Sequence, residues 1–123
     1  MERSGGMPDI RMKRIYEPAE PTDGFRVLVD RLWPRGVKKE SAGLDLWAKE
    51  IAPSHELRKA FHSGYDSWQE FAVKYRAELS DNPALRNFID TIRDKQAVTL
   101  LFAGKDTEHT HVKVIADMLK QKD

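Results

Sequence analysis

The amino-acid sequence predicts a small α/β domain. Two runs, residues 27–29 and 97–103, are apolar apart from Thr99, which is typical of strands that a parallel sheet buries on both faces. Between them, apolar residues recur at three- and four-residue spacing, as they do on the buried faces of helices. Helices that connect parallel strands form right-handed crossovers. The pattern therefore predicts a three-layer, Rossmann-like domain with a short, mostly parallel sheet and about five helices.

The first half of the chain is predicted to contain two strands and one helix. Residues 12–16 favour a strand, and the proline- and glycine-containing stretch 17–24 favours a loop. The apolar run 27–29 is the first strong strand. Residues 41–51 are predicted to be helical, because their apolar side chains would share one helical face.

The second half is predicted to contain the remaining helices and the second strong strand. Ser54 and Ser67 are good N-caps for two helices, and Ser67 forms a capping box with Glu70. Pro83 suits the first position of a third helix. After the strand at 97–103, Thr107 is the predicted N-cap of the last helix.

Length and composition limit the class of protein. The 123 residues fit one domain, with residues 1–9 predicted as a disordered lead-in and residues 10–123 as the folded unit. The chain has no cysteine, which excludes disulfides and cysteine-ligated metals and agrees with a cytoplasmic location. No apolar run approaches the ~20 residues needed to span a bilayer, so no membrane association is predicted.

The charge balance does not favour nucleic-acid binding. Lysine and arginine together number 21 and aspartate and glutamate 20, giving a formal net charge of +1. A dedicated nucleic-acid binder usually carries a basic stripe and a high pI. The overall balance shows no such stripe and leaves open only a local basic patch.

A candidate ligand site lies after the two strong strands, at residues 30–36 and 104–111. The carboxyl ends of parallel strands meet at the same edge of a sheet, where ligands commonly bind. Arginine, lysine and histidine side chains there suit an anionic small molecule, the glycines permit close backbone approach, and the tryptophan offers a stacking wall. The predicted ligand-binding residues are Arg31, Trp33, Arg35, Gly36, Gly104, Lys105 and His111.

Asp30 and His109 are the candidate catalytic residues. Asp30 could act as a base or a covalent nucleophile, and His109 either as an acid/base or as a hydrogen-bonded wall residue. His109 and His111 would not share one face of a helix, so no metal site is predicted. The chain has neither a P-loop nor a G-x-G-x-x-G motif, so the sequence assigns no cofactor.

Several distinctive motifs follow one another along the chain. They are V-D-R-L-W-P-R-G at 29–36, L-D-L-W-A-K-E-I-A-P-S at 44–54, L-R-K-A-F-H at 57–62, W-Q-E-F-A-V-K-Y-R-A-E-L at 68–79 and L-L-F-A-G-K-D-T-E-H at 100–109. With these motifs the chain resembles the YeaO-like family, a bacterial and archaeal domain of unknown function. The resemblance implies a Rossmann-like α/β domain in cytoplasmic proteins and implies no known reaction.

The resemblance also transfers motif positions. The family's D-R-x-W-P-R-G motif falls on residues 30–36, and its K-D-x-x-H pattern falls on residues 105–109. More distant relatives carry Cys-His-Arg where this chain has Thr110, His111 and Val112. Chemistry that depends on that cysteine or arginine is therefore not implied here.

Three functions agree with these observations. The first is an enzyme or binding protein for a phosphorylated or nucleotide-like small molecule, and the sequence leaves the choice between catalysis and binding open. The second is a non-catalytic interaction or regulatory module, for example a homodimer that uses Trp33 or Trp47. The third and least favoured is nucleic-acid binding through Arg35, Lys38, Lys39 and Arg58.

Overall fold

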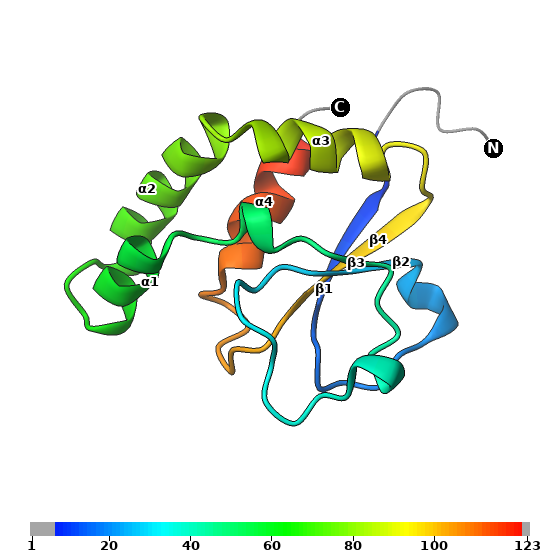
Figure 1. Cartoon of the computed structure of the whole chain (residues 1–123). Coiled ribbons are helices and arrows are strands. Elements are labelled where there is room, and N and C mark those ends of the chain that lie inside the picture. Colours follow the sequence, from blue (N-terminus) through cyan, green and yellow to red (C-terminus); the bar gives the residue numbers. More distant parts are fainter. Residues whose placement is uncertain (1–6, 122–123) are drawn as a thin grey trace.

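The computed structural model describes residues 7–121 and contains a four-stranded, fully parallel sheet (Figure 1). The strands are β1 (Asp9–Arg14), β2 (Phe25–Leu28), β3 (Leu46–Trp47) and β4 (Ala97–Phe102), in the order β1-β4-β2-β3. The α-helices are α1 (His55–His62), α2 (Trp68–Ser80), α3 (Pro83–Ile92) and α4 (His111–Lys120). Short 3₁₀ turns occupy Pro21–Asp23, Lys39–Ser41 and Lys49–Ile51.

Helices cover one face of the sheet and loops cover the other. Val27 of β2 and Leu100 of β4 lie in the main core, to which all four α-helices contribute. Leu28 and Leu101 point to the opposite face, where they pack with strand and loop residues alone. Figure 1 shows α1–α4 together on one side of the strands. The parallel α/β prediction is confirmed, whereas the third layer is absent from the described residues.

The predicted helix at residues 41–51 is wrong, and with it the count of five helices. Gly43 has a positive φ of 63°, and the Asp45 carboxylate accepts a hydrogen bond from the Arg26 amide at 2.9 Å. The Asp45 amide donates to the Arg26 carbonyl, so this segment pairs with β2 and forms β3. Tertiary pairing outweighs the helical spacing of the apolar residues. The described chain has four α-helices, and the Rossmann-like detail is not confirmed.

The N-terminal strand begins earlier than predicted. It covers Asp9–Arg14 rather than residues 12–16, and Met7 is only 3% exposed within the main core. The folded part therefore extends before residue 10. The rest of the predicted lead-in, residues 1–6, lies outside the described residues.

The helix starts in the middle of the chain follow the predicted caps. The Ser54 hydroxyl accepts from the Leu57 amide at 3.2 Å, and Ser67 and Glu70 form both bonds of the capping box. Pro83 occupies the first turn of α3. These starts depend on nearby residues, which is why the sequence predicts them.

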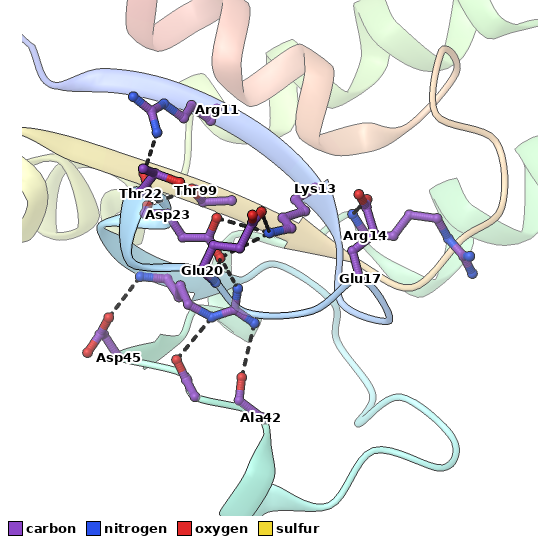
Figure 2. Close-up of polar contacts among 12 residues, drawn as sticks. Arg11, Lys13, Arg14, Glu17, Glu20, Thr22, Asp23, Ala42, Asp45 and Thr99 are labelled. Carbon is purple, nitrogen blue, oxygen red and sulfur yellow. Dashed lines mark hydrogen bonds and ion pairs between the residues drawn. The ribbon is translucent and has the colours of Figure 1, made fainter.

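A buried ion network fixes the loops against the sheet. The Asp23 carboxylate accepts from Lys13 Nζ at 3.1 Å and from Arg26 at 2.5 Å (Figure 2 shows Lys13 directed at Glu20 and Asp23). Burial alone would raise the pKa of Asp23, but hydrogen bonds from the Glu20 amide, Lys13 and Arg26 outweigh it and lower the pKa. Arg26 also donates to the carbonyls of Ala42 and Gly43. Each buried charge therefore has partners, as burial requires.

Candidate functional site

The two loops predicted to meet at the sheet edge do meet. The Val29 amide donates to the Leu101 carbonyl at 3.0 Å, just past the paired parts of β2 and β4. One residue further on, the Asp30 carboxylate accepts from the Ala103 amide at 3.0 Å. Asp30 therefore joins the two strand ends, and residues 30–34 lie beside residues 103–111.

A cavity of about 520 Å³ opens at this edge, which is within the size range of small-molecule sites. Seven predicted site residues line it: Asp30, Arg31, Trp33, Gly104, Lys105, His109 and His111. The remaining lining comes from both loops and from α1 and α2: Leu32, Pro34, Pro53, Arg58, Phe61, His62, Phe71, Ala103, Asp106 and Thr110. Arg35 and Gly36 are not among the lining residues.

His111 is the histidine that pairs with Asp30. Its Nε2 lies 3.3 Å from Asp30 Oδ1 and also contacts the Val29 carbonyl. A carbonyl oxygen can only accept, so Nε2 carries the proton. Both side chains are largely buried, with exposures of 19% for His111 and 17% for Asp30. The pair stabilises the junction between β2 and the start of α4.

His109 lies in a loop. The last helix was predicted to start after Thr107, but it begins only at His111, so that prediction is wrong. The Asp106 carboxylate accepts from the amides of Glu108 and His109, each at 2.9 Å, and from His109 Nδ1 at 3.2 Å. These amides lower the pKa of Asp106. This local turn delays the helix until His111, with Thr110 as its N-cap residue. The His109 ring packs 5.3 Å from the Trp68 ring, at the rim of the cavity.

Arg31 and Trp33 mainly shape the wall of the cavity. The Arg31 guanidinium donates to the carbonyls of Ala52 and Pro53, which ties the loop after β2 to the segment before α1. Trp33 Nε1 donates to the Val37 carbonyl at 2.7 Å, and its ring lies 5.2 Å from that of Trp47. These contacts use the one Trp33 donor and two of the three Arg31 guanidinium nitrogens within the protein.

Arg35, Gly36 and Gly104 contribute to the fold through their backbone atoms. The Arg35 carbonyl accepts a hydrogen bond from the Tyr16 hydroxyl at 2.9 Å. Arg35 is exposed and does not line the cavity. Gly36 has a φ of 78°, so the turn itself favours glycine there. The Gly104 carbonyl accepts from Arg14 at 2.8 Å, and a Cβ at Gly104 would meet no atom within 4 Å.

The charges that remain unpaired in the cavity are cationic. Asp30 and Asp106 are both held by amide and histidine donors. In contrast, the side chains of Arg58 and Lys105 form no ion pair or hydrogen bond with any residue that the structure describes. The cavity can therefore offer two free cations to an anionic ligand.

Several residues that line the cavity were not predicted as site residues from the sequence, among them Arg58, Phe61 and Thr110. The first two lie on α1, whose helix is predicted correctly but whose position at the sheet edge depends on tertiary packing. Thr110 was expected inside a helix. The D-x-x-H spacing of Asp106 and His109, followed by a threonine, is the signal that indicates a turn before an N-cap.

Residues 7–121 contain no cluster of histidine and carboxylate side chains that could hold a metal ion. No helix in the described part of the chain is long and apolar enough to cross a membrane.

A family model described as the inactive DUF488-N3 subclade matches residues 9–123. The chain belongs to this family. The uncharacterized protein YeaO of Escherichia coli K12 is 48% identical over 112 residues, which cover 91% of this chain and 97% of YeaO. The uncharacterized protein Rv3073c of Mycobacterium tuberculosis H37Rv is 38% identical over 110 residues, 89% of this chain and 92% of that protein. No solved structure matches the chain. The resemblance to the YeaO-like family is confirmed.

Proposed function

We propose that this protein is a cytoplasmic binding protein for a phosphorylated small molecule. The observation that carries the proposal is the cavity at the carboxyl ends of β2 and β4, where the side chains of Arg58 and Lys105 have no ion-pair or hydrogen-bond partner within residues 7–121. Charged donors in a concave site bind anions more strongly than neutral donors do. Ligands of open parallel sheets bind at this edge.

Binding is favoured over catalysis by two further observations. The matching family is described as an inactive subclade. In addition, Asp30, the candidate catalytic base, uses its carboxylate to hold the Ala103 amide and faces the proton on His111 Nε2. A carboxylate with these partners stabilises the strand junction, and no serine or cysteine nucleophile lines the cavity within the described residues.

A thermal-shift screen tests the proposal. The panel contains inorganic phosphate, sugar phosphates and nucleoside monophosphates, each titrated against the wild type. A ligand at a hundred times its dissociation constant adds about 2.7 kcal/mol of stability, which shifts the Tm of a domain this size by several degrees. A screen that finds no stabilising phosphate would contradict the proposal and favour the interaction module.

Two charge-removing variants locate the site. Arg58→Ala and Lys105→Ala each remove an unpaired cation, so each should weaken binding about tenfold or more. Lys120→Ala is the matched control, because Lys120 is an exposed lysine in the last turn of α4 and does not line the cavity. Equal weakening by Lys120→Ala would show that the effect comes from overall charge instead of this cavity.

A further inference from the structure

We infer that Thr110 and the first turn of α4 bind the phosphoryl group, and that the ligand is a phosphomonoester. This inference rests on the proposed function and deepens it. Thr110 lies in the loop of the predicted site but is not among the predicted ligand-binding residues, and it takes no part in the ion pairs described above. Its hydroxyl is a buried polar group at the cavity that has no partner in the described part of the chain.

Thr110 is buried and polar, and its hydroxyl forms no hydrogen bond with any described residue. The residue is 5% exposed and lines the cavity. Although Thr110 is the N-cap residue of α4, its side chain makes no capping bond. Within residues 7–121, Asp66 Oδ2 is the one fully enclosed side-chain atom without a partner, so the unpartnered Thr110 oxygen is not fully enclosed. The cavity is the concave surface that Thr110 lines.

The backbone beside Thr110 provides further donors. Thr110 has extended backbone angles, φ −114° and ψ 143°, and α4 begins at the next residue. The Lys113 amide donates to the Thr110 carbonyl at 3.0 Å. The first amides of a helix, those of His111 and Val112 here, have no carbonyl within the helix to bond. The start of this ten-residue helix also carries partial positive charge, which favours an anion.

The donors identify the chemical class of the ligand. A hydroxyl, two amides and the Lys105 ammonium can supply hydrogens to several oxygens of one group, and the carboxylates nearby are already paired. A phosphomonoester offers three terminal oxygens and up to two negative charges. A phosphodiester offers only two such oxygens and one charge. The array therefore matches the terminal phosphoryl group of a monoester.

A titration followed by ¹H–¹⁵N NMR tests this inference with methyl phosphate and dimethyl phosphate as the paired probes. We expect methyl phosphate to shift the amide signals of His111 and Val112, and dimethyl phosphate to bind at least about tenfold more weakly. Thr110→Val keeps the branched shape but removes the hydroxyl. Losing one hydrogen bond to a charged group should weaken methyl phosphate binding about tenfold to a hundredfold.

Three comparisons separate a binding role of Thr110 from a structural one. Thr110→Ser keeps the hydroxyl and should bind like the wild type. Thr107→Val changes an exposed threonine of the same loop that does not line the cavity, and should also bind like the wild type. The Tm of ligand-free Thr110→Val should remain that of the wild type, because the hydroxyl caps nothing.

The outcomes distinguish this inference from the proposed function. If methyl phosphate binds and depends on Arg58 and Lys105 but not on Thr110, the inference is wrong and the proposed function stands. Equal binding of the two probes would overturn the assignment to phosphomonoesters. If neither probe nor any other phosphate binds the wild type, both proposals fail. Should Thr110→Val not fold, the His111 and Val112 shifts in the wild type and the binding of Thr110→Ser decide the result.

Discussion

Replacing Asp30 with alanine should destabilise the protein, because Asp30 joins the ends of two strands. The substitution leaves the Ala103 amide without its acceptor at 3.0 Å and removes the carboxylate that faces His111. A hydrogen bond to a charged group contributes about 1.5–3 kcal/mol, and the Asp30 side chain is only 17% exposed. We expect a loss of about 2 kcal/mol in the free energy of unfolding.

Urea unfolding followed by circular dichroism measures this change. In a thermal scan the same loss corresponds to a decrease in Tm of roughly 6–12 °C for a domain of this size. Asp90→Ala is the matched control, since Asp90 is an exposed aspartate of α3, and its removal should change stability by less than about 0.5 kcal/mol. If Asp30→Ala proves as stable as Asp90→Ala, Asp30 does not hold the junction and a direct role toward a ligand becomes the better explanation.

Three further predictions test other parts of the structure. Tyr75→Phe should lower the free energy of unfolding in urea by about 1–3 kcal/mol, because the buried Ile51 carbonyl loses the hydrogen bond that it accepts from the Tyr75 hydroxyl at 2.5 Å. An unchanged urea midpoint would contradict a contribution of this bond to stability. The hydrogen-bond partners of Asp23 lower its pKa in the folded protein. Ionised Asp23 therefore stabilises the fold at pH values above the ordinary pKa of about 3.9, and this stabilisation is lost as the pH falls through the lower pKa of the folded state. Asp23→Asn should therefore lose less stability than the wild type as the pH falls below about 4, and parallel curves would refute this explanation. Asp106→Ala removes the acceptor of the Glu108 and His109 amides, so these amides should exchange with solvent faster while the amides of β4 keep their protection.

The sequence predicts those parts of the fold that depend on neighbouring residues. The strand Ala97–Phe102 is apolar apart from Thr99, and Ser54 and Ser67 cap helices through residues three positions away. The segment that forms β3 depends instead on Asp45 pairing with Arg26, nineteen positions away along the chain. Such a pairing is not visible in the local spacing of apolar residues.

The candidate site was predicted in its position and only partly in its residues. The rule for parallel strands correctly brings Asp30 beside the loop that contains Lys105. It does not indicate that α1 brings Arg58 to the same edge, because helix packing fixes that position. Arg35 was expected at the cavity because it lies in the loop after the strand at residues 27–29 and its guanidinium suits an anion, but Arg35 is not among the lining residues. Loop geometry of this kind depends on contacts that the sequence alone does not show.

Calorimetric titration of a phosphomonoester into the wild type and into an Arg58→Ala/Lys105→Ala double variant tests the central claim most directly. We expect saturable binding with one site in the wild type. We also expect at least a hundredfold weaker binding in the double variant, because two charge-assisted contacts are lost. Equal affinity in the two proteins, or no heat of binding in the wild type across the phosphate panel, would contradict the assignment of an anion site to this edge of the sheet.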